Sequence, residues 1–320
     1  MFILSVAATS RMTAPSGAIV VAKSGGTYTT ITEAVDSLSA TTTSTQIIFI
    51  EEGTYNEQVY IPSLVGELII YGQTKDTSDY ASNLVIVTND IGLSSVDDDD
   101  ETATLRNYAE NSKIYNINVA NTHGKGEQAL ALSAYATNQG YYACQFTGYQ
   151  DTVLAEIGNQ IYAKCLIEGA VDFIFGQHAT AWFDDCDIRV LSSSVGTITA
   201  NGRSSSSDVS FYVINKSKIA AADDNSVSSG SYYLGRPWSE YARVVFQYTS
   251  MTDVINSAGW EEWSSSDPRI SDVYFEEYDN TGEGASGTRA SFAKKLTSPI
   301  EITTILGSNY KDWVDTDYLS

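Results

Sequence analysis

One spacing recurs in the segment "CQFTGYQDTVLAEIGNQIYAKCLIEGAVDFIFG", which covers residues 144–176. Cys144 and Cys165 lie 21 positions apart, and Asp151 and Asp172 have the same separation. A third segment beginning at Cys186 continues the cysteine column, and an apolar column follows it at Phe146, Ile167 and Ile188. A fixed period of this length predicts stacked structural repeats, with one coil for every 21 residues here.

Short apolar runs extend this interpretation along the chain. They occur at "IIFI" (47–50), "LIIY" (68–71) and "LVIV" (84–87). Near-continuous runs of this length are typical of buried parallel strands, which ordinarily need crossover helices. Between residues 45 and 250 helical periodicity is scarce, with "EQALALSAYA" as an ambiguous exception. The pattern favours an all-β parallel β-helix, with longer coils around "YNINVAN" and "NKSKIAA".

The flanking segments complete a single-domain interpretation. Residues 18–320 are expected to form the β-helix, with a short N-terminal capping helix at "TITEAVDSL", where Thr30 and Glu33 fit a capping box. A C-terminal tail is expected to pack on the coils. Residues 1–17 are either a signal remnant or an N-terminal extension, because "MFILSVAATS" has a short apolar run followed by small residues but no basic region.

Composition excludes several classes of protein. The 320 residues carry a formal net charge of −22, which disfavours nucleic acid and anionic membranes as partners. Three cysteines cannot form a disulfide framework, and we expect them to be free thiols stacked inside the coils. No apolar run approaches the roughly 18 to 20 residues of a membrane span. The sequon "NKS" at Asn215 gives weak support for secretion.

The repeat places Asp151 beside Asp172, because neighbouring strands in a sheet lie about 4.8 Å apart. Two adjacent carboxyl groups tend to share one proton, which supplies an acid together with a base or nucleophile. Taken alone, the pair favours solvated aspartates at coil corners, and it is the surrounding residues that favour a catalytic pair. Gln128 and Gln150 are 22 residues apart and are candidate donors to an oxyanion. Further along, "LGRPW" supplies Arg236 to hold a carboxylate and Trp238 to stack on a sugar.

Taken together, the motifs make the chain resemble the pectin methylesterases, and the fungal members in particular. The matching segments are "GTYNEQV" from Gly53, "QALAL" from Gln128, "GYQDT" from Gly148, "DFIFG" from Asp172, "LGRPW" from Leu234 and "GWEEW" from Gly259. The resemblance implies a right-handed parallel β-helix that removes methyl esters from polygalacturonate without a metal or other cofactor.

The resemblance also implies roles for individual residues. Asp172 would be the nucleophile and Asp151 the general acid and then base, while Gln128 and Gln150 would stabilise the tetrahedral anion. Arg236 would hold Asp172. Expected substrate contacts are Trp238, Phe175 and Thr104, the last from a weaker match in "ETATL". Many plant members read "QDTLY" where this chain has "QDTVL", so an aromatic contact is missing at Leu154.

The expected partner is methyl-esterified homogalacturonan, acted on by a secreted, extracellular monomer, and the resemblance admits a proteinaceous inhibitor. Other functions stay open from the residues alone. Paired carboxylates also serve glycoside hydrolases of the polygalacturonase type, and the acidic run "VDDDDET" at 96–102 could hold Ca²⁺ in a pectate lyase. A carbohydrate-binding β-helix without catalysis is a further alternative. A Ser-His-Asp esterase is disfavoured, because no GxSxG motif occurs.

Overall fold

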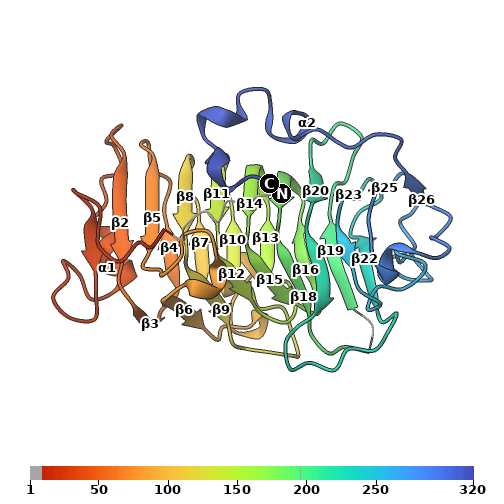
Figure 1. Cartoon of the computed structure of the whole chain (residues 1–320), viewed down its shortest axis with the longest axis horizontal. Coiled ribbons are helices and arrows are strands. Elements are labelled where there is room, and N and C mark those ends of the chain that lie inside the picture. The colour runs from red at the N-terminus through yellow and green to blue at the C-terminus, as the bar shows by residue number, and fades with distance from the viewer. Residues whose placement is uncertain (1–8, 195) are drawn as a thin grey trace, which may run out of the picture.

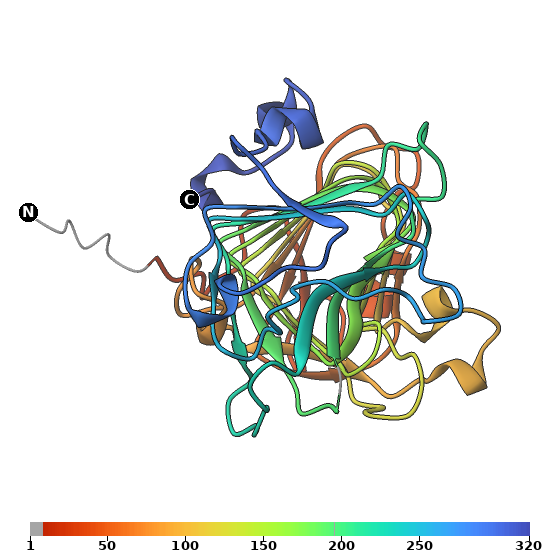
Figure 2. The same cartoon turned by 90° about the vertical axis from the view of Figure 1, so that its right-hand side faces the viewer.

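The chain winds into a parallel β-helix in a computed structural model that describes residues 9–194 and 196–320. Three sheets run along the length of the molecule (Figure 1). Figure 2, turned by 90°, shows their strands stacked as walls around a common interior. The predicted fold class is therefore confirmed. Residues 1–8, the first part of the expected signal remnant or extension, lie outside the described residues.

The first sheet has eleven strands in the order β1-β2-β5-β8-β11-β14-β17-β20-β23-β25-β26. Their bounds are Ile19–Val21, Gln46–Ile50, Leu68–Gly72, Ser112–Tyr115, Gln139–Tyr142, Ile157–Ala163, His178–Asp184, Phe211–Asn215, Arg243–Gln247, Tyr274–Tyr278 and Ala293–Lys295. The second sheet has seven strands in the order β22-β19-β16-β13-β10-β7-β4. They span Tyr232–Pro237, Gly196–Asn201, Val171–Gly176, Val153–Ala155, Leu132–Ala134, Leu105–Asn107 and Val59–Ile61.

The third sheet has eight strands in the order β24-β21-β18-β15-β12-β9-β6-β3. They span Ser250–Met251, Lys218–Ala221, Asp187–Val190, Leu166–Gly169, Gln145–Thr147, Asn118–Asn121, Val85–Asn89 and Gly53–Asn56. All three of the apolar runs singled out in the sequence are strands. The segment "EQALALSAYA" also contains a strand, β10, so its ambiguous helical pattern is not realised. Leu132 and Ala134 of this strand face the core, which alternation along a strand explains.

Helices are short: one lies at the N-terminal end of the β-helix, and the other packs against β14, β17 and β20 in the middle of the eleven-stranded sheet. The predicted capping helix is α1 (Ile31–Asp36), which packs against β1 and β4. The Thr30 hydroxyl accepts a hydrogen bond of 3.2 Å from the Glu33 amide, as a capping box requires. The second α-helix is α2 (Ile302–Leu306). Single 3₁₀ turns occur at Tyr80–Ser82, Leu93–Ser95, Asp99–Thr102, Glu283–Ala285, Tyr310–Asp312 and Thr316–Tyr318. Within the described ranges, no helix has the length and apolarity to cross a membrane.

Residues 21 positions apart lie side by side on successive coils in this part of the chain. Pairing of β12 with β15 and of β15 with β18 places Phe146, Ile167 and Ile188 in one row. The same register aligns the three cysteines, which are buried free thiols, as predicted. The next coil is longer, because β17 pairs with β20 through Thr180 and Phe211.

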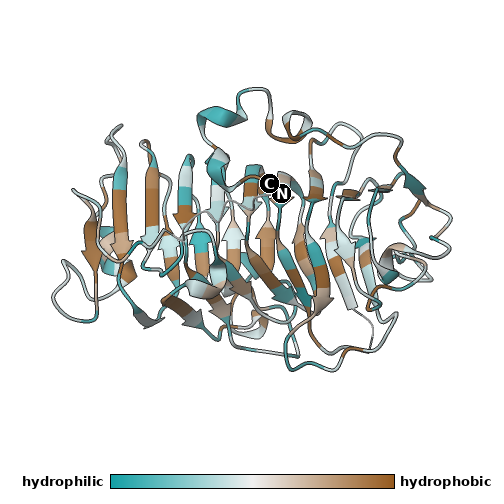
Figure 3. Cartoon of the chain, viewed as in Figure 1, coloured by the Kyte–Doolittle hydropathy of each residue, from teal (hydrophilic) through white to brown (hydrophobic). Residues whose placement is uncertain are grey.

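Aromatic side chains stack inside the coils in the same way. The ring centroids of Tyr141 and Tyr162 are 5.0 Å apart, and those of Tyr162 and Phe183 are 4.5 Å apart with nearly parallel planes. All three rings are buried in the central core. Hydrophobic residues colour the strands along the whole length in Figure 3, while the connecting turns are mostly hydrophilic. The fold is therefore stabilised by continuous apolar rows rather than by one compact centre.

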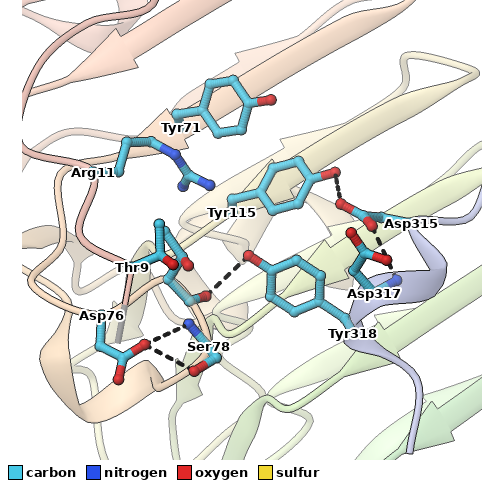
Figure 4. A pocket seen from close by; sticks show the side chains of 10 residues that line it. Thr9, Arg11, Tyr71, Asp76, Ser78, Tyr115, Asp315, Asp317 and Tyr318 are labelled. Atoms are coloured by element: carbon cyan, nitrogen blue, oxygen red, sulfur yellow. Dashed lines mark hydrogen bonds between the residues drawn. The ribbon is translucent and has the colours of Figure 1, made fainter. Parts of the chain in front are cut away.

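The C-terminal tail packs on the eleven-stranded sheet, as expected. The Tyr115 hydroxyl donates to Asp315 Oδ2 at 2.9 Å, and the Tyr318 hydroxyl donates to the Thr77 carbonyl at 2.9 Å. The Arg11 guanidinium lies 4.2 Å from the Tyr71 ring centroid. These groups line a cavity of about 430 Å³ between residues 9–11 and residues 315–318 (Figure 4). Part of the 1–17 segment thus contacts the coils.

The sequon asparagine is not on an accessible loop. Asn215 ends β20 with 5% of its surface exposed, and its amide donates to Asp184 Oδ1 at 2.6 Å. Its carbonyl oxygen accepts from Gln247 at 2.9 Å. A glycosylation acceptor is normally exposed on the surface. The Asn215 sequon therefore no longer supports secretion.

The aromatic stack predicts a large stability effect from a single truncation. Phe183→Ala should lower the free energy of unfolding by about 3–5 kcal/mol, because it leaves a cavity next to Tyr162. Val209→Ala, at a position 65% exposed, is the control and should change it by less than about 0.5 kcal/mol. Chemical denaturation followed by circular dichroism measures both. Equal stabilities for the two variants would contradict the inferred role of the stack.

Candidate active site

Asp151 and Asp172 meet on the outer face of the seven-stranded sheet. Asp172 belongs to β16, and Asp151 lies just before β13. Gln150 pairs with Val171, and Val153 pairs with Ile174, so the two aspartates occupy equivalent positions on neighbouring coils. The strand spacing of about 4.8 Å brings their side chains into close proximity. The arrangement that the repeat predicted is present in the structure.

Local backbone geometry turns both carboxyl groups away from the regular strand pattern. The φ angles of Asp151 and Asp172 are 63° and 49°, in the left-handed region that aspartate tolerates better than most residues. The pairing of β16 with β19 also shifts register between Val171 and Ile174. Such a bulge adds a residue on one strand and re-aims a side chain. Phe173, directly after Asp172, is consequently in the inner core.

Three donors hold the Asp172 carboxylate. Arg236 Nε lies 3.0 Å from Oδ1 and Nη2 lies 2.6 Å from Oδ2, which makes a bidentate ion pair. The Thr197 hydroxyl donates to Oδ1 at 2.5 Å and accepts from the Asp172 amide at 3.1 Å. Bidentate guanidinium pairs fix both position and orientation. Asp172 is therefore presented as an ordered anion, which suits a nucleophile.

Asp151 has a different environment. It is buried, and its carboxyl group has no hydrogen-bond partner among residues 9–194 and 196–320. Burial raises the pKa of Asp151 well above its usual range, and the negative charges of Asp172 and Asp99 raise it further against an opposing effect of Arg236. A carboxyl group with a raised pKa retains its proton and can donate it. The two aspartates thus differ in the way that acid and nucleophile must differ.

Gln128 and Gln150 lie beside the pair. The Ala129 amide donates to the Gln150 carbonyl at 3.2 Å, which joins the two segments on adjacent coils. Both side chains are half-buried, and neither amide group has a hydrogen-bond partner in the described part of the chain. Two uncommitted amide donors next to a nucleophile are suited to an oxyanion.

An apolar strip extends from the aspartates across the outer face of the sheet. Phe175 and Trp238 contact each other with ring centroids 6.1 Å apart, and Leu154 is part of the same cluster. Gly202 leaves room for Trp238, because a Cβ there would come within 2.6 Å of the indole ring. The cluster is completed by Ala103, Leu130, Tyr135 and Ala200. Aromatic faces of this kind can stack on sugar rings.

Thr104 does not join this surface. It is fully buried, and its hydroxyl donates to the Ala120 carbonyl at 2.9 Å. The expectation that Thr104 contacts substrate is therefore wrong for this conformation, because its only polar group is committed inside the coil. His178, near the "DFIFG" motif, is exposed, with Nδ1 2.7 Å from Asp208 Oδ2.

Several contacts of the site were not anticipated from sequence. Thr197 lies on β19, and the guanidinium carbon of Arg236 lies 4.4 Å from the Trp263 ring centroid. The negative charge of Asp99, in the turn at Asp99–Thr102, raises the pKa of Asp151. Thr197 belongs to none of the motifs that drew attention, whereas Asp99 lies in the acidic run "VDDDDET", which was considered only as a Ca²⁺ site. Trp263 does lie in the quoted "GWEEW", so that motif was an available signal for it.

Side chains of the acidic run "VDDDDET" accept hydrogen bonds from other groups of the protein. The Asp98 side chain accepts from the Glu101 amide at 3.2 Å. Asp100 accepts from Arg106 Nε at 2.9 Å and from the Ser133 hydroxyl at 2.6 Å. Among the described residues, no cluster of three or more His, Cys, Asp or Glu side chains could hold a metal ion.

Comparison with known proteins adds independent findings. Residues 18–298 match the family model described as Pectinesterase. A pectinesterase from Aspergillus niger is 68% identical over 322 residues, which cover 100% of this chain and 97% of the relative. One from Aspergillus aculeatus is 63% identical over 321 residues, covering 99% and 97% respectively.

Solved structures show the same relationship. The deglycosylated form of an Aspergillus niger pectin methylesterase superposes with a TM-score of 0.91 at 40% identity, covering 97% of this chain and 100% of that one. A pectin methylesterase from carrot gives a TM-score of 0.84 at 30% identity, with 96% and 98% covered.

The raised pKa of Asp151 predicts a pH-dependent stability difference. Above about pH 4 the unfolded chain releases this proton, whereas the folded protein keeps it until its higher pKa. The free energy of unfolding contributed by Asp151 therefore falls as pH rises through this window. Asp151→Asn removes the effect, so its stability relative to wild type should increase with pH above about 4.

Urea denaturation at a series of pH values tests this prediction. Asp253→Asn, which removes an exposed carboxyl after β24, controls for the loss of one negative charge. A stability difference between Asp151→Asn and wild type that stays constant from pH 4 to 8 would refute the assigned environment of Asp151.

Proposed function

The chain belongs to the pectinesterase family, and from this premise we propose how its own residues carry out the reaction. It is a carboxylic ester hydrolase that removes methyl esters from the C6 carboxyl of galacturonate in pectin, releasing methanol and pectate. The observation that carries the proposed residue roles is the contrast between the two aspartates. Asp172 is a held anion, whereas Asp151 is a buried acid with a raised pKa.

In the first half of the reaction, an Asp172 carboxylate oxygen attacks the C6 carbonyl carbon. The carbonyl π electrons move to the oxygen, and the amides of Gln128 and Gln150 donate hydrogen bonds to this developing anion. When the tetrahedral intermediate collapses, the bond from C6 to the methoxy oxygen breaks. Asp151 gives its proton to that oxygen, so methanol leaves and an acyl anhydride with Asp172 remains.

In the second half, water attacks the same C6 carbon of the anhydride. Asp151, now ionised, accepts a proton from the water, and the bond from C6 to Asp172 breaks. Asp172 returns as a carboxylate, and the new C6 carboxyl group leaves as the acid. Arg236 and Thr197 hold Asp172 in place throughout, so that both attack and departure occur from one position.

Trp238 and Phe175 are proposed to contact the sugar rings of the substrate, since both lie on the apolar strip next to Asp172. We also propose that the enzyme is secreted and acts as a monomer on methyl-esterified homogalacturonan, with a proteinaceous inhibitor as a further partner. Extracellular action agrees with the activity, because the polymer is a cell-wall component outside the cell.

Product analysis separates this function from its rivals. Ester hydrolysis yields methanol without shortening the polymer, whereas a polygalacturonase makes reducing ends. A lyase of the Ca²⁺-dependent type makes unsaturated ends and stops in a chelator. Methanol release that persists in a chelator, with no change in chain length, is the expected result.

Removing either aspartate should abolish the reaction. Asp172→Ala lacks the nucleophile, and Asp151→Ala lacks the proton donor and acceptor, so neither should release methanol from methylated pectin. Circular dichroism should show that both variants retain the fold. Asp253→Ala is a matched control on an exposed loop and should keep wild-type activity. Normal turnover by either active-site variant would contradict the role proposed for that aspartate.

Thr197 is proposed as a positioning residue for the nucleophile. Thr197→Val removes a hydrogen bond to a charged group worth about 1.5–3 kcal/mol, so kcat should fall roughly 10- to 100-fold with little change in KM. Thr197→Ser keeps the hydroxyl and should restore most of the rate. Thr199→Val removes a hydroxyl that donates to the Leu234 carbonyl at 2.9 Å, and should affect stability more than kcat. Equal kcat values for the valine and serine variants at position 197 would rule out this role.

A further inference from the structure

A cavity of about 430 Å³ opens beside the nucleophile. Val171, Thr197 and Arg236 line it on the side of the seven-stranded sheet, and residues 261–265 line it on the other. Val171 directly precedes Asp172, while Thr197 and Arg236 both contact it. The cavity falls in the size range of small-ligand pockets. Any polymer bound across Asp172 would have an adjoining unit close to this cavity.

The charged groups of the lining that have no partner are carboxylates, so the cavity carries a net negative charge. Glu261 and Glu262 both line it, and within the described ranges neither carboxyl group has a hydrogen-bond or ion-pair partner. Arg236 is the cationic residue of the lining, but its guanidinium is already engaged by Asp172. The guanidinium carbon of Arg269 lies 4.8 Å from the Trp263 ring centroid, and its Nε donates to Asp267 Oδ2 at 2.8 Å. A ligand entering here therefore meets uncompensated carboxylates.

The pKa of Glu261 is affected by the charges of both Asp172 and Arg236. Burial raises its pKa, Asp172 and Glu262 raise it further, and Arg236 opposes them. Glu261 and Arg236 line the same cavity, and Arg236 is bonded to Asp172, so Glu261 lies near both charges. The Glu261 amide also donates to the Gly235 carbonyl at 3.1 Å, which fixes this residue next to β22.

We propose that this cavity receives the sugar unit adjacent to the one being hydrolysed, and that Glu261 makes it select a methyl-esterified unit over an ionised one. The inference rests on the proposed function and deepens it by naming a specificity residue. A neutral ester avoids repulsion by Glu261, and sugar hydroxyl groups can donate hydrogen bonds to its carboxylate. An ionised galacturonate brings a like charge into a partly buried site, where screening by water is reduced.

The test compares methanol release from two pectins of equal length, one densely and one sparsely methyl-esterified. The measured quantity is the ratio of kcat/KM per ester on the dense substrate to that on the sparse one. Glu261→Gln should lower this ratio about fivefold or more, mainly by increasing kcat/KM on the sparse pectin. Glu261→Lys should lower it further.

The control must allow for the net charge of −22, which repels every polyanion. Glu283→Gln removes one charge from an exposed turn that packs against β24, in another sheet, and should leave the ratio unchanged. Ionic strength gives a second readout. Raising it from about 0.01 to 1 M shortens the screening length from about 30 to 3 Å, so the wild-type ratio should fall more than that of Glu261→Gln.

Two results would overturn the inference. If Glu261→Gln changes kcat/KM on both pectins by the same factor, Glu261 acts only on the catalytic pair. If the ratio falls equally in Glu283→Gln, the selectivity comes from overall charge. The proposed function fails separately, because wild type would then release no methanol from either pectin.

Discussion

Parallel pairing of successive coils is the constraint on which the rest of this structure depends. Each residue on a strand has a neighbour about 4.8 Å away on the next coil, so equal coil length turns a sequence period into a row. The same register stacks the cysteines, the interior rings of Tyr141, Tyr162 and Phe183, and the two aspartates. The chemistry of each row depends on which face of the sheet it occupies. The cysteines and rings lie in buried interior rows, whereas the two aspartates lie on the outer face, where they are proposed to react.

Two like groups in one row have different surroundings. The Asp172 carboxylate accepts hydrogen bonds from Arg236 and the Thr197 hydroxyl, whereas Asp151 is buried near further negative charge. Both aspartates also need a left-handed backbone, and Asp172 lies at a bulge in β16. The sheet supplies proximity, and these local departures from regular strand geometry supply orientation. The cavity lined by Glu261 adjoins this pair, and in the proposed selectivity its charge distinguishes an ester from an acid.

Much of this could be read from the sequence, because strong local signals and a strict period were available. The strands at 47–50, 68–71 and 84–87, the capped helix at Thr30 and the adjacency of Asp151 and Asp172 needed no tertiary information. The ambiguous helix at "EQALALSAYA" was wrong, since pairing of β10 with β7 and β13 in the parallel sheet overrides its helix-forming residues. Thr104 was wrong as well, because a weak motif match cannot tell an inward from an outward side chain.

The contacts that sequence could not supply come from coils of unequal length. Thr197 follows Asp172 by more than one 21-residue period, so no column points to it, and Asp99 reaches Asp151 from a turn distant in the chain. The sequence by itself determined the coil period, the interior rows and which carboxyl groups are neighbours, because these follow from pairing of adjacent strands. Only the tertiary structure decided which aspartate is held as an anion and which is kept as an acid. Charge, burial and hydrogen bonding converge on them from several coils, and no single stretch of sequence contains that information.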